Sequence, residues 1–469
     1  MSNHTASLRE PLVRMDKLPW VTFLIITAIF FYTLHDFFHT RSYLDLGVDV
    51  FNPPEEEAVE IMAKFEAGQL RNAVAYTLLG LFGLVTMLLP RRNRLALNGL
   101  FGLLMLFLVF WTFSSVLWAE SPDVTVKKLA ILAMMCIAVV SVSRRFSDRD
   151  LILFTFYSTG AFLAIGLTAE IALGTFQPQV AGWRFSGTCH PNSQALNTGL
   201  LFLAALYLRN KEGKRRWYGA VAVIAFVCLV LTKSRTGIGG ASLAAVLFWV
   251  LAKPWSTRTS LYCLFAVLFV IVLSYAEANL PRIEEGSLLG RTDTDVGQVR
   301  TLTGRTDLWG ATREYMTRRA LLGYGYVSFW TVEHIERIAG DVGFVPSTAH
   351  SAYVDVVLSL GLVGLFLFVL VYFIGIRLTI DYYRSTGGKV YAFYGAVLIY
   401  ALLHSLTESS FLFPALSTFV SLAILVRLGF QAPPEPSGVS AAGPSDRAGT
   451  PLSAKVGALP EAVGPAGGV

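Results

Sequence analysis

Charged residues and cysteines are scarce in this sequence, and both shortages narrow its class. Charged residues make up 15% of the 469 residues, whereas soluble globular proteins carry about 25%. Hydrophobic residues make up 54%, and the mean hydropathy is +0.56. Apolar runs of roughly 20 residues, long enough to cross a bilayer as helices, recur along the chain. The composition therefore excludes a soluble globular protein and predicts an all-α polytopic membrane protein.

The four cysteines exclude two further kinds of structure. Three of them lie inside apolar runs, and none is spaced as in a CxxC pair. The sequence therefore predicts neither a disulfide framework nor a zinc site. The net charge of +6 does not indicate nucleic-acid binding, because most basic residues lie in short loops between apolar runs, where membrane topology explains them.

The apolar runs predict about twelve transmembrane helices. They lie near residues 20–38, 72–90, 95–117, 125–143, 150–173, 192–209, 217–233, 236–252, 259–276, 352–376, 390–407 and 412–429. Every second loop is basic, as at residues 91–94 and 209–216, whereas the segment 39–71 is acidic. Because Lys and Arg concentrate in cytoplasmic loops, we expect the basic loops and both termini to be cytoplasmic.

The predicted spans divide the chain into five parts. Residues 1–19 form a cytoplasmic N-terminal segment, and residues 20–276 hold spans 1–9. Residues 277–351 form one large periplasmic loop before the tenth span, and residues 352–429 hold spans 10–12. Residues 430–469 are rich in Pro, Gly, Ala and Ser. Such a segment cannot bury enough apolar surface to offset its ordering entropy, so we expect a disordered cytoplasmic tail.

Basic residues also occur at the expected outer ends of spans, where topology does not require them. Arg184 and His190 lie in the loop after the fifth span, and Lys233 and Arg235 lie in the turn after the seventh. One interpretation is that Arg235 extends to lipid headgroups. The other is a substrate-binding site for an anion, because the planar guanidinium offers paired donors to phosphate.

Three more candidates border the long outer loop and the eleventh span. Arg305 lies in GRTDLWG, where Thr306 or Asp307 is a candidate helix cap, and it is either a solvated arginine or an anion ligand. His350 lies where the loop enters the tenth span. It is either a structural histidine or a general base, since its ordinary pKa lies near neutral pH. Glu408, at the outer end of the eleventh span, either bonds a neighbouring loop or belongs to the site.

A metal site is not expected. Asp293 and Asp295 form an Asp-Thr-Asp sequence of the kind that holds a divalent metal in nucleotide-sugar transferases. They are expected outside the cell membrane, where nucleotide sugars are absent. We therefore predict neither a metal nor another cofactor.

Six stretches form an ordered set. They are SSVLWAESPDVTVKKLA (114–130), SGTCHPN (186–192), LTKSRTG (231–237), GRTDLW (304–309), LLGYGYVSFW (321–330) and AHSAYVDVVLSLGLVG (349–364). In order and spacing they resemble the O-antigen ligase and polysaccharide polymerase superfamily, over residues 70–430. The last two favour the exopolysaccharide polymerase branch, although Ser351 stands where that family often has Asn.

The resemblance implies an enzyme of the bacterial inner membrane. It implies inverting transfer of a glycan from undecaprenyl diphosphate to a sugar hydroxyl at the periplasmic face, without metal or nucleotide. A polymerase uses another lipid-linked repeat unit as acceptor, and a ligase uses lipid A core. By this resemblance Arg235 and Arg305 hold the diphosphate, and His350 is the catalytic histidine. The expected partners are donor, acceptor and membrane lipid but no nucleic acid, and other polysaccharide export proteins are candidates.

A transporter or flippase of lipid-linked glycans is the alternative from another class. That function predicts charged residues deep in several spans and paired broken helices. In this sequence the middles of the predicted spans are nearly free of charge, and polar residues gather at the outer ends. The pattern therefore favours chemistry at the membrane surface.

Overall fold

The residues that the computed structural model of the protein describes form helices joined by loops, with no strand among them. These residues are 18–34, 55–89, 92–180, 183–211, 215–251, 253, 257, 261, 304–409 and 413–431. The helices are α1 (Leu18–Leu34), α3 (Glu55–Met87), α4 (Gly99–Ser114), η1 (Ser115–Trp118), α5 (Pro122–Arg145), α6 (Asp148–Ala172), α7 (Pro191–Lys211), α8 (Arg215–Leu231), α9 (Arg235–Leu251), α13 (Arg305–Arg318), α14 (Val332–Val342), α15 (Ala352–Thr386), α16 (Lys389–Ser405) and α17 (Leu416–Phe430). The all-α polytopic class is confirmed.

Each predicted span within the described residues coincides with a helix. Five of these helices are long and apolar enough to cross a membrane. They are Leu70–Leu88, Gly99–Trp118, Pro122–Arg145, Asp148–Ala172 and Ala352–Thr386. The predicted span 259–276, the Asp293–Asp295 pair and the tail beyond residue 431 lie outside the described residues, and the total of twelve spans stays a prediction.

One helix begins well before its predicted span. We expected residues 39–71 to form a loop, but α3 already begins at Glu55. Glu and Ala recur in residues 55–67, and both favour helix. The acidic composition is thus compatible with helix, and it bears only on the predicted side of the membrane.

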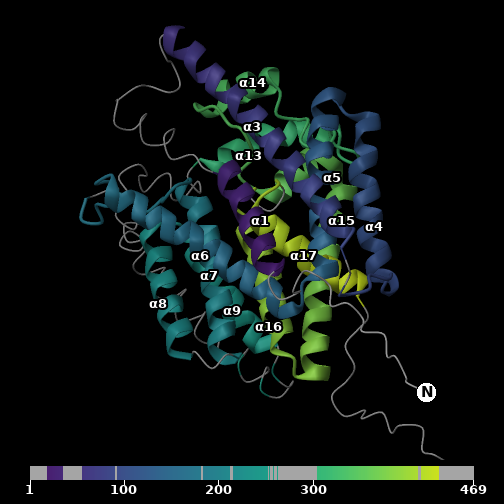
Figure 1. The fold of residues 1–469 in the computed structure, drawn as a ribbon. Coiled ribbons are helices and arrows are strands. Elements are labelled where there is room, and N and C mark those ends of the chain that lie inside the picture. The colour runs from purple at the N-terminus through teal and green to yellow at the C-terminus, as the bar shows by residue number, and fades with distance from the viewer. Residues whose placement is uncertain are drawn as a thin grey trace, which may run out of the picture.

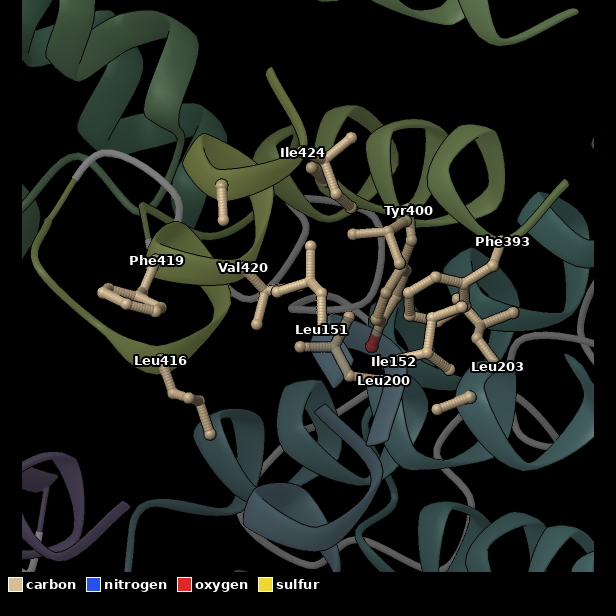
Figure 2. Packing of buried hydrophobic residues seen from close by; sticks show 14 of the residues in the cluster. Leu151, Ile152, Leu200, Leu203, Phe393, Tyr400, Leu416, Phe419, Val420 and Ile424 are labelled. Atoms are coloured by element: carbon tan, nitrogen blue, oxygen red, sulfur yellow. The ribbon is translucent and has the colours of Figure 1, made fainter. Parts of the chain in front are cut away.

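The main core lies where α6, α7, α16 and α17 meet, as Figure 2 shows. Tyr400 of α16 is fully buried and lies beside two glycines of neighbouring helices. A Cβ on Gly199 of α7 would lie 2.5 Å from the Tyr400 hydroxyl, and one on Gly240 of α9 would lie 3.1 Å from its ring. Small residues at helix contacts let membrane helices approach closely. These two glycines thus hold α7 and α9 against α16, which ends near the candidate site.

Helix α15 is interrupted at Gly361, where the backbone has φ 70° and ψ −172°. The segment 320–325 fills the interruption. The Leu362 N–H donates to the Ala320 carbonyl at 2.7 Å, and the Tyr324 N–H donates to the Leu358 carbonyl at 2.7 Å. Backbone groups freed by the break are therefore paired, as a membrane protein requires. Two stretches that carry the family resemblance, 321–330 and 349–364, are thus docked against each other.

Gly361→Ala is expected to destabilise the fold by about 3 kcal/mol or more, because Gly361 has a glycine-only conformation and no room for a side chain. A Cβ there would lie 2.0 Å from the Leu321 carbonyl oxygen. The measurement is the midpoint of unfolding by SDS in mixed micelles. Gly310→Ala is the matched control, because nothing lies within 4 Å of its added Cβ. Equal midpoints for the two variants would contradict this account.

The loop before α15 contributes two helices, α13 and α14, which lie together at one end of the bundle (Figure 1). Leu308 and Tyr315 of α13 are buried in a small core with Phe329 and Ile338. The expected cap at Thr306 or Asp307 was wrong by two or three residues. Helix α13 begins at Arg305 and follows Gly304, whose φ is 76°. Arg305 is therefore the first residue of the helix.

Candidate functional site

Four side chains form a continuous hydrogen-bonded chain. Arg305 Nη2 donates to Glu408 Oε1 at 2.5 Å, and Asn192 Nδ2 donates to the same oxygen at 2.6 Å. Arg184 Nη2 donates to Asn192 Oδ1 at 2.8 Å. The side chains of Arg305 and Glu408 are only 18% and 11% exposed, so solvent screens their ion pair less than it screens a surface pair. The structure thus joins Arg305 to Glu408 directly and joins Arg184 to them through Asn192.

Helix ends position three members of this hydrogen-bonded chain. Asn192 is the second residue of α7, and Arg305 is the first residue of α13. Glu408 lies three residues after α16 ends at Ser405, and its N–H donates to the His404 carbonyl at 3.1 Å. Residues far apart in the sequence therefore meet because several helices end at the same level.

A buried carboxylate anchors the loop that carries Arg184. Glu170, near the end of α6, accepts the N–H groups of Ser186 at 3.0 Å and Gly187 at 2.8 Å. A Cβ on Gly166 would lie 2.8 Å from the Gly187 Cα, so the loop backbone packs directly on α6. Glu170 thereby fixes the loop from inside the bundle, and its role is to position the site.

Arg235 lies beside the chain, at the start of α9, and its side chain is half-buried. The next residue, Thr236, shares a 2.5 Å hydrogen bond with Thr407, which precedes Glu408. On the other side, Arg184 Nε donates to the Thr232 carbonyl at 2.9 Å. The turn before α9 is therefore tied to the site at two points.

His350 precedes Ser351, the residue that caps α15, and has φ 49°, a rare conformation for a residue other than glycine. Burial and, to a smaller extent, the positive charge of Arg305 together lower the pKa of His350 to about 4. The imidazole is therefore neutral at neutral pH. The Ala349 carbonyl, directly before His350, accepts a 2.8 Å hydrogen bond from Trp309 of the helix that Arg305 begins, which ties the turn of His350 to the same neighbourhood.

Glu408 experiences opposing influences. Burial raises its pKa above the ordinary value, while the charges of Arg305 and Arg184 and its hydrogen bonds act in the opposite direction. The cluster holds two arginines against one carboxylate, with Arg235 beside it. An excess of partly buried positive charge with paired donors is suited to an anion such as a diphosphate.

His190 is linked to this chain through the backbone of Asn192. Its side chain is exposed, and its Nδ1 accepts the Asn192 N–H at 3.2 Å. This bond places the ring over the N-terminus of α7, where backbone N–H groups need acceptors. Substrate binding by His190 stays a prediction.

Several residues of the site were missed by the sequence analysis. Asp355 and Trp309 form hydrogen bonds to Ala349, in the turn before His350. Trp330 and Ser409 form hydrogen bonds to Asp355. Only Asp355 had a signal, because an acidic residue in an otherwise apolar predicted span is a functional candidate. The others have ordinary side chains whose importance depends on what they contact.

Together the fold and the cluster define an integral membrane protein with a cationic, partly buried site at one end of a helical bundle. Residues 220–369 match the family described as O-Antigen ligase. The match supports a relation of this part of the chain to the O-antigen ligase and polysaccharide polymerase superfamily, whose members are membrane enzymes acting on lipid-linked glycans. Arg235, Arg305 and His350 lie inside the matched residues, whereas Arg184 and Glu408 lie outside them. No curated protein matches the chain.

Proposed function

We propose that this protein transfers a glycan from undecaprenyl diphosphate to a sugar hydroxyl at the periplasmic face of the bacterial inner membrane. The observation that carries the proposal is the cluster in which Arg184, Asn192, Glu408 and Arg305 are joined, with the turn before His350 bonded to the helix that Arg305 begins. We favour a polymerase, whose acceptor is another lipid-linked repeat unit, over a ligase, whose acceptor is lipid A core.

In the proposed reaction, the acceptor oxygen attacks the anomeric carbon from the face opposite the diphosphate. The new glycosidic bond forms as the bond to the diphosphate oxygen breaks, so the configuration inverts. Negative charge develops on the leaving diphosphate, and donors already in place stabilise such charge most effectively. Arg305 and Arg235 supply these donors, so the proposal needs neither metal nor nucleotide. The proton of the acceptor hydroxyl passes to His350.

The neutral state of His350 suits a base, but a pKa of about 4 makes it a weak one. Part of that low value comes from the charge of Arg305. A bound diphosphate neutralises this charge, and a nearby anion also favours the imidazolium ion directly. Donor binding therefore raises the basicity of His350 just before the proton has to move.

A difference between two pH profiles is expected from this coupling. The profile of kcat/KM for the donor reports the free enzyme, and that of kcat reports the donor complex. As pH falls, kcat/KM should decline near pH 4, where free His350 becomes protonated. The decline in kcat should occur at a higher pH. Glu408→Gln removes the other titrating group of the cluster. If kcat and kcat/KM decline at the same pH in that variant, the proposed coupling between donor binding and the pKa of His350 is contradicted.

The reaction itself is tested by deleting the gene and sizing the glycans. Loss of long extracellular polymer with normal lipopolysaccharide is the result expected for a polymerase. Polymer that accumulates on undecaprenyl diphosphate, together with bare lipid A core, identifies a ligase. Normal polymer and normal lipopolysaccharide would overturn both forms of the proposal.

The orientation of the site is tested by cysteine labelling. In a background without native cysteines, Glu336→Cys on exposed α14 should react with an impermeant maleimide in cells whose outer membrane alone is permeabilised. Ser385→Cys, near the end of α15 and exposed, is the matched control on the opposite side and should react only after inner-membrane lysis. The reverse pattern would place the site in the cytoplasm and overturn the proposed reaction.

A further inference from the structure

Asp355 is a buried carboxylate that the proposed reaction does not use. It lies in the first turn of α15 and is 2% exposed. The Ala349 N–H donates to its Oδ1 and Oδ2 at 3.1 and 3.2 Å, and Trp330 Nε1 donates to Oδ1 at 2.8 Å. The Ser409 hydroxyl donates to Oδ2. Both oxygens are therefore bonded, and the donors come from three separate segments.

These bonds connect Asp355 to elements that carry the site. Ala349 directly precedes His350, and Ser409 directly follows Glu408. The Ala349 carbonyl accepts a 2.8 Å hydrogen bond from Trp309 Nε1, one turn along α13 from Arg305. The backbone of Ala349 is thus held at its N–H by Asp355 and at its carbonyl by α13.

The held backbone matters because His350 has a left-handed conformation. A residue other than glycine keeps such a conformation only where its surroundings enforce it. The His350 N–H donates to Thr348 Oγ1 at 3.3 Å, a long bond that by itself constrains little. The bonds on both sides of Ala349 therefore constrain the backbone from which the imidazole extends.

We propose that Asp355 is a positioning residue for glycan transfer, which acts by fixing the turn that directs His350 toward Arg305 and Glu408. This inference rests on the proposed function of His350. Asp355 touches neither donor nor acceptor in this account. Its contribution is to keep His350, Arg305 and Glu408 in fixed positions relative to one another.

Asp355→Asn is the informative change because it keeps the size of the side chain. The Ser409 hydroxyl can rotate to accept from the new amide, and the remaining oxygen still accepts from Trp330. The Ala349 N–H, however, lies 3.1–3.2 Å from both positions and would face an NH₂ donor at one of them. The turn at His350 should therefore loosen while the helices stay packed.

The test is a double-mutant cycle with purified protein in nanodiscs and lipid-linked donor. Asp355→Asn should reduce kcat by about 10–100-fold, as small misplacements of catalytic groups do. Donor affinity should change little. In the His350→Ala background the same substitution should cause no further loss, because Asp355 acts through His350. Ser421→Ala, a buried change in α17, is the control and should have the same effect in both backgrounds.

Two outcomes overturn the inference. One is normal kcat in Asp355→Asn, and the other is an equal loss of rate in the His350→Ala background, which would indicate general destabilisation. If Asp355→Asn fails to fold, Trp330→Phe and Ser409→Ala each remove one bond to Asp355, and the same cycle applies to them.

A measurement that does not depend on glycan transfer distinguishes this inference from the proposed function. Diethyl pyrocarbonate modifies neutral imidazoles, and mass spectrometry measures the rate at His350, with exposed His190 as the internal reference. Asp355→Asn should change the rate at His350 several-fold and leave the rate at His190 unchanged. An unchanged rate at His350 overturns the inference. Absence of transfer by the wild-type protein overturns the proposed function instead.

Discussion

His350→Ala is expected to reduce glycan transfer by about 10²–10⁴-fold, the usual effect of removing a general base. Donor binding should be largely retained, because the arginines that are proposed to hold the diphosphate stay in place. His350 lies at the entrance of α15, and its pKa of about 4 keeps it unprotonated in the resting protein. The measurement is turnover by purified protein in nanodiscs, together with donor affinity.

Two comparisons make this result specific. Arg337→Ala on exposed α14 is the matched control, because its ion pair with Glu333 has side chains that are 58% and 76% exposed. Pairs so exposed contribute little, and this variant should transfer normally. Full turnover in His350→Ala would refute the assignment of the base. Loss of both turnover and donor affinity would instead indicate that His350 binds the diphosphate.

Arg305→Lys is expected to lower kcat by about 10²–10³-fold, as the loss of a donor to developing charge does. A lysine keeps the charge but offers a point charge instead of a planar fork. Arg305 also bonds Glu408 at 2.5 Å, so the variant leaves this buried carboxylate with a poorer partner. Arg313→Lys is the matched control, because Arg313 is exposed on the same helix.

Arg235 and Glu408 extend this comparison. Arg235→Lys should also be damaging, because the turn before α9 is held against the residue that precedes Glu408. Glu408→Gln should fold, since its amide oxygen can still accept from Arg305 and Asn192. Near-normal transfer in both lysine variants, at normal protein levels, would show that the two arginines face lipid or solvent and do not bind the diphosphate.

The helical class followed from the sequence because hydropathy is a local property. A run of apolar residues has to form helix in a bilayer, whatever lies beside it, since every backbone polar group needs a partner. Each predicted span among the described residues is therefore a helix. The boundary of α3 was harder to predict, because Glu55 to Ala67 also has good helix-forming residues and no apolar run to mark it.

The interruption of α15 was less predictable. The run AYVDVVLSLGLVGLFLFVL reads as one continuous span, and one glycine in a membrane helix is common. The break at Gly361 exists because the segment 320–325 supplies partners for the freed backbone groups. That segment lies about forty residues earlier in the chain, so a reading of local patterns cannot show the pairing.

By itself the sequence determined the helical membrane class, the motifs of the superfamily and a short set of candidates that includes Arg184, Arg305 and Glu408. The tertiary structure decided that these three side chains form one hydrogen-bonded chain with Asn192, that the turn before His350 is bonded to the helix of Arg305, and that His190 lies at a helix N-terminus. The physical reason is the difference in sequence distance over which the two properties are determined. Hydropathy acts over neighbouring residues, whereas a binding site requires helix ends from distant parts of the chain to meet at one level, and only packing sets that level.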